Sequence, residues 1–329
     1  MLNTETFSIW AKALGFAEVG FCTIDPFIRS YQIVQSQQTL AERKQLRFFP
    51  SEDLPSAKSI AVLLWPYSQA PLPEEGEVFV DSYYAASNAA YHAARTLEEQ
   101  VVNSGYFAKA NVSYPAKEAA IRAHLGLIGH HSLLITPSHG SRVVIILMAT
   151  DIEISSDIQI VHPQTCLLCG KCTQACPSGA IDHNGMTYPE RCLRNFTMEG
   201  VVVPEETRAK IGMRLIGCDI CQRGCPMQPK DSPSQKRPYR LSDFITEDSE
   251  TFSGAVANLS HEIGRNAARP QRVRAQAALL AGNSKKAAYL PVLRQWAQLP
   301  FEAVSPHARW AIGQIKSHLS TLDGIEQSE

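Results

Sequence analysis

The first half of the chain alternates between stretches with a helical spacing of apolar residues and short, unbroken apolar runs. Apolar residues three and four positions apart are typical of an amphipathic helix, and a short apolar run bounded by turn residues is typical of a buried strand. We therefore expect helices at 7–14, 89–102 and 116–125, and strands at 15–22, 59–65, 132–135 and 143–148. Together they predict an α/β domain over residues 1–155.

Two of these apolar runs lie on either side of a short polar turn. Ser132–Ile135 and Val143–Met148 are separated by a segment that contains Pro137, Ser138 and Gly140. Apolar runs joined by a few residues with proline and glycine favour a β-hairpin. We expect the two runs to pair with each other.

Beyond residue 230 the chain is rich in alanine and has helical spacing. A linker-like stretch, Pro229–Pro238, precedes it, because its prolines and serines disfavour regular structure. An Ala-x-x-Ala pattern followed by a large aliphatic residue occurs at 275–279 and recurs 33 residues later, at 308–312. This recurrence predicts a HEAT-like array of stacked helices over residues 231–329, although a plain helical bundle would show the same pattern.

Composition places the chain among ordinary globular proteins. Of its 329 residues, 44% are hydrophobic and 19% are charged, and the length allows two or three domains. No stretch reaches the roughly 20 apolar residues of a membrane helix, and the start, Met1–Glu5, lacks the basic and apolar regions of a signal peptide. We therefore expect a cytoplasmic protein without a membrane partner.

One segment departs from the chain's near-neutral net charge of −1. Residues 265–316, called the basic segment below, contain a single acid, Glu302, and nine basic residues: Arg265, Arg269, Arg272, Arg274, Lys285, Lys286, Arg294, Arg309 and Lys316. A local excess of positive charge attracts polyanions such as tRNA through their phosphates. A solvated helical face with its counter-charges elsewhere has the same composition, so both interpretations stay open.

Eight of the nine cysteines lie between residues 166 and 225, in two clumps with one cysteine between them. The first clump, Cys166–Pro177, reads C-x2-C-x2-C-x3-C-P, and the second, Cys218–Pro226, reads C-x2-C-x3-C-P. The first is the bacterial ferredoxin run, whose fourth cysteine binds a different cluster from the first three. Eight thiolates are the number that two 4Fe–4S cubanes need. The pattern predicts two 4Fe–4S clusters in an α+β ferredoxin-like module over residues 156–230.

The crossover of the fourth cysteine divides the ligands into two sets. Proline after Cys176 and after Cys225 ends each ligand loop, because it fixes φ and lacks an N–H donor. Cluster 1 is predicted to be bound by Cys166, Cys169, Cys172 and Cys225, and cluster 2 by Cys176, Cys192, Cys218 and Cys221.

Disulfide bonds and zinc sites are the alternative uses of these cysteines. The missing secretory signal and the close spacing argue against disulfides. Paired C-x2-C motifs also bind zinc, but a zinc protein rarely carries both of these runs. The ninth cysteine, Cys22, stands far from the others in an apolar sequence, and we expect it to be a buried small hydrophobic residue.

Motifs on both sides of the cysteines give a further indication. They are Ala-Leu-Gly-Phe-Ala-Glu-Val-Gly at 13–20, Leu-Pro-Ser-Ala-Lys-Ser-Ile-Ala-Val at 54–62, His-Leu-Gly-Leu-Ile-Gly-His-His at 124–131, Gly-Cys-Asp-Ile-Cys at 217–221 and Arg-Asn-Ala-Ala at 265–268. With the eight cysteines, they resemble the epoxyqueuosine reductase family. These are cobalamin-dependent iron–sulfur enzymes that complete queuosine on tRNA and are related to reductive dehalogenases.

The chain departs from that family where the family has polar active-site residues. The family's proton-donating aspartate would precede the helix at 116–125, but residues 107–115 contain no acid. The family's Gly-Lys-Asn is Gly129-His130-His131 here, its Asp-Tyr-His is Ala90-Tyr91-His92, and a strand glutamate is Leu147. The resemblance therefore implies a divergent paralogue with altered active-site residues, from which we expect little epoxyqueuosine reduction.

The resemblance also implies that the α/β domain over residues 1–155 is of the cobalamin-binding type, and that it holds cobalamin largely by backbone and shape, as the family does. An empty pocket or another flat cofactor is the alternative. With the aspartate missing, Tyr114 is the candidate proton donor, as a tyrosine is in reductive dehalogenases, and His130 and His131 are candidate cofactor-binding residues, since imidazole titrates near neutral pH. Packing before Pro115 is the competing role for Tyr114, and loop capping or surface exposure is the competing role for the histidines.

Two functions remain open at this point. The first is an oxidoreductase that takes electrons from a low-potential donor, reduces a modified nucleoside and docks tRNA through the basic segment. The second is an electron-transfer or corrinoid-handling iron–sulfur protein without tRNA-modifying activity. Uptake of cobalamin and reduction of its cobalt would separate the two.

Overall fold

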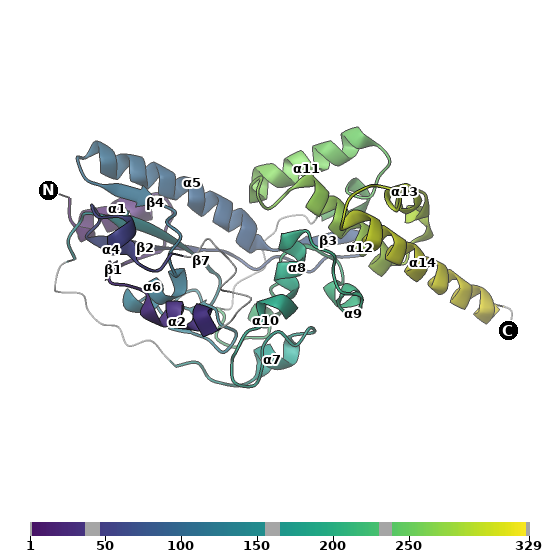
Figure 1. Cartoon of the computed structure of the whole chain (residues 1–329), viewed down its shortest axis with the longest axis horizontal. Helices are drawn as coiled ribbons and strands as arrows, with labels where there is room; N and C mark the ends of the chain where they lie inside the picture. Colours follow the sequence, from purple (N-terminus) through teal and green to yellow (C-terminus); the bar gives the residue numbers. More distant parts are fainter. Residues whose placement is uncertain (1, 37–46, 155–164, 230–238, 327–329) are drawn as a thin grey trace.

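The computed structural model describes residues 2–36, 47–154, 165–229 and 239–326. Figure 1 shows an α/β lobe (2–36 and 47–154) at one end and a helical lobe (239–326) at the other. A cysteine-rich module (165–229) lies between and below them. The linker expected at 229–238 lies outside the described residues except for Pro229.

A four-stranded sheet with the order β1-β2-β7-β4 forms the centre of the α/β lobe. Its strands are β1 Glu18–Thr23, β2 Ser59–Pro66, β7 Val143–Thr150 and β4 Ala108–Ala110. Every neighbouring pair is antiparallel. Helices and strands alternate along the chain as expected, but the sheet is not the parallel one that successive βαβ units build.

The hairpin expected between Ser132–Ile135 and Val143–Met148 is wrong. Strand β6 (Leu134–Ile135) pairs instead with β5 (Leu127–Ile128), whereas β7 pairs with β2 and β4. An apolar strand such as β7 takes the interior of a sheet, where a neighbour on each edge satisfies its backbone groups.

The apolar run of β2 is buried on both faces of the sheet. Ala61 and Leu63 belong to the core on one face, while Ile60, Val62 and Leu64 belong to the core on the other. Because successive side chains of a strand point to opposite faces, a sheet covered on both sides requires an unbroken apolar run. Cys22 of β1 is buried on one of these faces, which confirms its prediction as a small core residue.

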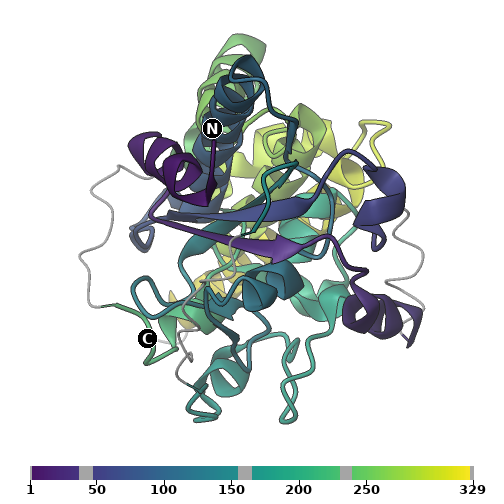
Figure 2. The same ribbon diagram turned by 90° about the vertical axis from the view of Figure 1, so that its left-hand side faces the viewer.

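Helices cover both faces, as the end view in Figure 2 shows. The helices α1 (Thr4–Ala13) and α5 (Ser82–Asn103) pack on one face and α6 (Ala116–Arg122) packs on the other. Two short helices, α2 (Ile28–Ser36) and α4 (Pro50–Asp53), accompany α6.

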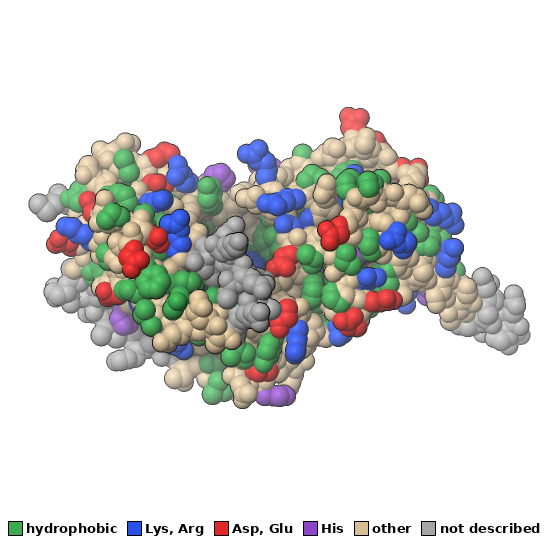
Figure 3. Space-filling model, in the orientation of Figure 1, with side chains coloured by type: hydrophobic (Ala, Val, Ile, Leu, Met, Phe, Trp, Pro, Cys, Tyr) green, Lys and Arg blue, Asp and Glu red, His purple; other side chains and the backbone are tan. Residues whose placement is uncertain are grey.

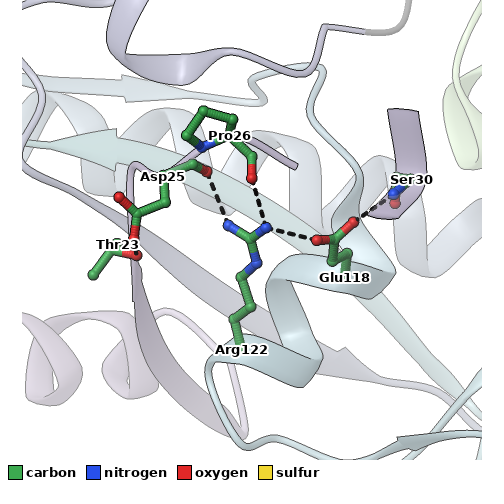
Figure 4. A network of polar contacts seen from close by, with 6 residues as sticks. All are labelled: Thr23, Asp25, Pro26, Ser30, Glu118 and Arg122. Carbon is green, nitrogen blue, oxygen red and sulfur yellow. Dashed lines mark hydrogen bonds and ion pairs between the residues drawn. The ribbon is translucent and has the colours of Figure 1, made fainter. Parts of the chain in front are cut away.

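An arginine at the end of α6 fastens this helix to the segment after β1 (Figure 4). The Arg122 guanidinium donates to the backbone carbonyls of Asp25, at 2.9 Å, and Pro26, at 2.7 Å. It also pairs with Glu118 one turn earlier, at 2.6 Å, and Glu118 accepts a hydrogen bond from the backbone N–H of Ser30 at 2.9 Å. These charge-assisted contacts hold α6 in position, and its first turn lines the candidate site.

The cysteine-rich module consists of short elements: α7 Lys171–Ala175, η1 Pro189–Arg191, α8 Leu193–Glu199, α9 Glu205–Arg208, η2 Ala209–Ile211, β8 Arg214–Ile216 and α10 Ile220–Arg223. A second sheet ties the module to the other parts of the chain. Its middle strand, β3 (Glu77–Val80), runs parallel to β8 and antiparallel to β9 (Tyr239–Arg240). The three ranges expected as domains thus share one sheet, and their boundaries stay a prediction.

The helical lobe contains η3 Leu241–Asp243, α11 Ser249–Ile263, α12 Pro270–Ser284, η4 Ala287–Tyr289, α13 Leu290–Trp296 and α14 Val304–Glu326. The helices α12 and α14 pack along each other, and the alanines of the recurring pattern are buried. A Cβ at Gly282 would lie 2.8 Å from the Cα of Ala311, so the two helices approach closely there. None of the helices in the described ranges is long and apolar enough to cross a membrane.

Candidate functional site

The first cysteine run folds as a loop that leads into a helix. Leu168 has a φ of 48° and Gly170 a φ of 72°, so the backbone turns sharply on both sides of Cys169. Glycine adopts this left-handed conformation without the penalty of a Cβ. Cys172 follows on α7 and is buried, whereas Cys169 is exposed.

Packing of α7 against α10 joins the two cysteine clumps. Gly224, directly after α10, lies at this contact, and a Cβ there would meet the Cβ of Ala175 at 3.4 Å, an ordinary van der Waals distance. One narrow cavity is consequently lined by His130, His131 and the set of cysteines predicted for cluster 1, namely Cys166, Cys169, Cys172 and Cys225.

The other four cysteines gather around Cys221. Burial raises the pKa of the Cys221 thiol well above its usual range, and the neighbouring charges of Cys218, Cys192, Cys176 and Cys172 raise it further. Burial likewise raises the pKa of Cys218 to about 11. Charges shift a pKa in this way only at short range. The structure therefore places Cys221 near the other three cysteines predicted for cluster 2 and also near Cys172, and the division of the ligands between the two clusters stays a prediction.

Two sets of four thiols fit two iron–sulfur cubes. A buried thiol gives up its proton near neutral pH when it coordinates a metal, which replaces the lost solvation. Within the described ranges, no three His, Cys, Asp or Glu side chains converge closely enough to hold a single ion. A cubane does not require this, because each of its four thiolates binds a different iron. In addition, the backbone N–H of Ala180 points to the Sγ of Cys176 at 3.3 Å.

The two histidines of the Gly129 loop have different surroundings. His130 is half-buried, and its Nε2 lies 3.1 Å from the carbonyl oxygen of Asp182. His131 is only 4% exposed, and its Nδ1 accepts a hydrogen bond from the backbone N–H of Leu133 at 3.2 Å. Burial, together with the positive charges of Lys117 and His130, lowers the pKa of His131 to about 4. Both rings adjoin the cluster 1 cysteines, and their contact with cobalamin stays a prediction.

A second cavity, of about 230 Å³, lies between the sheet and the cysteine-rich module. Ile145 of β7, Lys117 of α6 and Gln222 of α10 all line it. The Gln222 side chain donates to the hydroxyl of Tyr67 at 3.0 Å and to the carbonyl oxygen of Ser141 at 2.8 Å. Gln222 follows a cluster 2 cysteine in the chain, so this cavity adjoins the predicted electron carriers.

Lys117 brings a positive charge to the second cavity, and sequence reasoning missed it. Its Nζ donates a hydrogen bond to the carbonyl oxygen of Ser132 at 2.6 Å. The side chain is exposed to solvent. Partial desolvation of its ammonium group lowers the pKa of Lys117, and the charge of Arg194 acts in the same direction. A lysine in the first helical turn after Pro115 gives no signal in the sequence that distinguishes it from a solvated surface residue.

A third cavity, of about 310 Å³, shares Tyr67 with the second and is also lined by Phe79 and Tyr239. The Tyr67 ring meets the Tyr83 ring edge-on, with centroids 6.0 Å apart. Burial raises the pKa of Tyr67 well above its usual range, so the hydroxyl stays protonated. Figure 3 shows that the surface is hollowed between the α/β and helical lobes.

Tyr114 lies in the core of the α/β lobe. The residue is 5% exposed, and its ring stacks on Phe27 with centroids 6.0 Å apart. Its hydroxyl donates to Asp53 at 3.2 Å, and burial together with the charge of Asp53 raises the pKa of Tyr114 to about 12. Tyr114 lines neither the second nor the third cavity. The structure therefore favours the packing role over the predicted role as proton donor.

The basic segment does not form one free cationic face. The Arg274 guanidinium packs over two aromatic rings, and Arg272 donates to two backbone carbonyls just before α12. By contrast, Arg265 and Arg269 are exposed. Figure 3 shows Lys and Arg side chains interspersed with acidic ones over the helical lobe.

Comparison with known proteins agrees with this geometry. Residues 165–228 match the family model of the 4Fe-4S double cluster binding domain. The chain is 27% identical over 341 residues to the epoxyqueuosine reductase of Aliivibrio fischeri, covering 93% of this chain and 90% of that protein. It is 30% identical over 236 residues to the epoxyqueuosine reductase of Lactococcus garvieae, covering 66% of this chain and 67% of that protein.

A solved structure shows the same fold. It is an epoxyqueuosine reductase with an epoxyqueuosine-modified tRNA-Tyr stem loop, and its TM-score is 0.75 at 24% identity, covering 94% of this chain and 89% of that one. The fold and the two cysteine sets thus define a double 4Fe–4S protein. The sequence relatives identify the family: the chain belongs to the epoxyqueuosine reductase family.

Proposed function

We propose that this protein is an iron–sulfur, cobalamin-dependent reductase that acts on an epoxide-bearing nucleoside in tRNA. The observation that carries the proposal is the second cavity, which is lined both by Gln222 of α10 in the cysteine-rich module and by Lys117. A cofactor there would have electron carriers on one side and a proton source on another. In the proposal, Cys166, Cys169, Cys172 and Cys225 bind cluster 1, and Cys176, Cys192, Cys218 and Cys221 bind cluster 2.

The cavities offer room for part of a large, flat cofactor. The second and third cavities, of about 230 and 310 Å³, share Tyr67, and taken together they fall within the range of cofactor sites, roughly 300–1,000 Å³. Tyr67, Tyr83 and Gln222 would hold cobalamin there, largely through ring faces and neutral polar groups. Bound cobalamin would supply a low-potential cobalt centre, which protein side chains cannot provide.

Lys117 takes the place of the missing carboxylate in this proposal. Removing an epoxide oxygen to leave a carbon–carbon double bond consumes two electrons and two protons and releases water. The electrons come through the clusters from a low-potential donor, and at least one proton must reach the departing oxygen. The Nζ of Lys117 is held by Ser132 at the edge of the cavity, and its lowered pKa makes it a better acid than an exposed lysine.

The tRNA would be positioned by exposed arginines near the start of α12. Arg265 and Arg269 are available for phosphate contacts, and the related reductase described above was solved with a tRNA stem loop. Binding through phosphates is strongly salt-dependent. We place this activity in the cytoplasm, where tRNA is modified, and the HEAT-like interpretation of the α12–α14 pair remains part of the proposal.

The deciding experiment combines spectroscopy with product analysis. Protein reconstituted anaerobically with iron, sulfide and cobalamin is reduced and incubated with epoxyqueuosine-containing tRNA, and the nucleosides are quantified by mass spectrometry. We expect a cobalt spectrum that shifts on reduction. We also expect queuosine formation, in place of the low activity that the missing aspartate alone implies, because Lys117 supplies the proton. The Tyr114→Phe variant is the matched control and should retain this activity.

The alternative function is electron transfer or corrinoid handling without substrate chemistry. The absence of any carboxylate from residues 107–115 favours it. Intact clusters without cobalamin uptake would support electron transfer, and cobalamin uptake without product from any epoxide-bearing tRNA would support corrinoid handling. Either result would refute the proposed reductase.

A further inference from the structure

The hydrogen bond at one nitrogen of His131 determines where its ring carries a proton. Nδ1 accepts the backbone N–H of Leu133 at 3.2 Å. An accepting ring nitrogen carries no proton, so the single N–H of the imidazole lies at Nε2. The tautomer follows from this contact alone.

That Nε2–H group is buried and has no hydrogen-bond partner among the residues that the structure describes. His131 is only 4% exposed, so water does not solvate the group freely. An unsatisfied buried donor is unfavourable and is rare in native proteins. Some acceptor other than the protein groups placed here is therefore expected at this position.

The surroundings of the ring identify the kind of acceptor. The cavity that His131 lines is also lined by Cys166, Cys169, Cys172 and Cys225. The Nδ1–Cε1 edge of the ring faces Gly129, where a Cβ would lie 2.8 Å from Cε1 and 3.1 Å from Nδ1 of His131. The neighbouring His130 differs, since its Nε2 already lies 3.1 Å from the carbonyl of Asp182.

We propose that His131 donates a hydrogen bond from Nε2 to a sulfur atom of cluster 1 and thereby raises the reduction potential of that cluster. The inference rests on the proposed ligand set for cluster 1. Reduction adds negative charge to the cluster, so a donor to its sulfur stabilises the reduced form more than the oxidised form. Hydrogen bonds to the sulfurs are among the factors that set such potentials. His131 is in this sense a positioning and tuning residue rather than a catalytic one.

The test is a redox titration of the reconstituted full-length protein, followed by EPR. In His131→Phe, the equilibrium for reduction of cluster 1 should shift roughly tenfold toward the oxidised form, which is about 59 mV for a one-electron couple. The potential of cluster 2 should not change. A Cys169→Ser variant, expected to lack cluster 1, identifies which signal belongs to which cluster.

Two further variants separate tuning from a structural role. His131→Gln, whose amide can still donate, should recover part of the lost potential. His130→Gln, in the same cavity, should leave both potentials unchanged. In the wild-type protein, ENDOR spectroscopy of reduced cluster 1 should detect an exchangeable proton that disappears in D2O and is absent from His131→Phe.

The outcomes distinguish this inference from the proposed function. Unchanged potentials in a His131→Phe protein with its full iron content would overturn the tuning role alone. Failure to detect the exchangeable proton in the wild-type protein by ENDOR would also overturn it. This measurement does not depend on whether the variants fold. Wild-type protein that binds only one cluster, or zinc, would instead refute the proposed ligand sets.

Discussion

The imidazole of His307 on α14 accepts a hydrogen bond from the backbone N–H of Val203, at 2.9 Å, in the segment between α8 and α9. The other ring nitrogen, Nδ1, lies 3.0 Å from the carbonyl oxygen of Ala275 on α12 and donates to it. His307 is fully buried. One neutral side chain thus connects the helical lobe to the cysteine-rich module.

This contact predicts that the protein loses stability in mild acid. Burial lowers the pKa of His307 to about 4 from an ordinary value of 6.5, so between these values the unfolded chain binds more protons than the folded one. The contribution of His307 is therefore present above pH 6.5 and is lost as the pH falls toward 4, by at most about 3 kcal/mol. Urea unfolding between pH 7.5 and 5 measures it. In His307→Gln, the free energy of unfolding should depend less on pH, and the remaining dependence is due in part to His131. An equal change of this free energy with pH in the variant and the wild-type protein would contradict the prediction.

Cysteine replacement should remove the clusters one at a time. Wild-type anaerobic protein is expected to contain about eight irons from two cubanes, and Cys169→Ser or Cys221→Ser about half as many. Because Cys176 and Cys225 cross between the clumps, loss of either cube should also make its neighbour more labile. Cys22→Ala is the control and should keep its full iron content. Zinc in place of iron would show that the metal assignment is wrong.

Replacing Lys117 should separate proton transfer from binding. Lys117→Gln is expected to lower kcat by roughly a hundred- to ten-thousand-fold, the usual contribution of general acid catalysis, and to affect KM less. The wild-type rate should fall as the pH rises through the pKa of Lys117, and this fall should occur below the pH at which an exposed lysine titrates, since burial lowers the pKa. Tyr114→Phe should keep the wild-type profile. If Tyr114→Phe is the inactive variant, the assignment of the acid must be reversed.

Charge reversal at exposed arginines should weaken tRNA binding. In Arg265→Glu/Arg269→Glu, the affinity should fall, and the slope of log K against log salt should shrink by roughly 0.7–0.9 for each phosphate that the protein no longer binds. Arg274→Gln is the contrasting variant, because Arg274 packs on aromatic rings; it should lower stability and leave the salt dependence unchanged. Filter binding across a salt series checks both. Wild-type protein without salt-sensitive binding would exclude this surface as a docking site.

Two glycines on the paired helices should respond oppositely to alanine. A Cβ at Gly282 would lie 2.7 Å from the Trp310 ring and 2.8 Å from the backbone of Ala311, so Gly282→Ala should destabilise the lobe by about 1–3 kcal/mol. At Gly313 on α14 a Cβ meets nothing within 4 Å, and Gly313→Ala should stabilise it by about 0.4–1 kcal/mol. Thermal unfolding of the two variants measures the difference. A stabilising Gly282→Ala would show that α12 and α14 are less closely packed than described.

The hydrophobic pattern of the sequence predicted which segments form helices and strands better than it predicted which strands pair with each other. The apolar run 59–65 became β2, since burial on both faces leaves a clear signal along the chain. The strand partner predicted for Val143–Met148 was wrong. A strand that is apolar on both faces carries no local signal for its partner, which depends on the arrangement of the whole sheet. Turn residues after 135 indicate only that the chain changes direction.

The sequence likewise predicted some residues of the candidate site and missed others. Cysteine spacing predicted two groups of four, because short ligand loops fix their own geometry. Lys117 could not be recognised, since its chemistry depends on a cavity formed by α6, β7 and α10 together. A count of charges likewise showed nine cations in the basic segment but not that aromatic rings and carbonyls engage Arg274 and Arg272.

The parallel pairing of β3 with β8 has a consequence for how the protein is made. Phe79 pairs with Arg214, and at about 5–20 residues per second the ribosome needs on the order of ten seconds to synthesise the chain between them. Until then the apolar strand β3 has no partner and is open to aggregation. Cys218 and the helix α10, which carries Cys221, directly follow β8. We therefore expect iron–sulfur insertion to come after this late pairing, and a fragment ending near residue 155 to be insoluble rather than an independent folding unit.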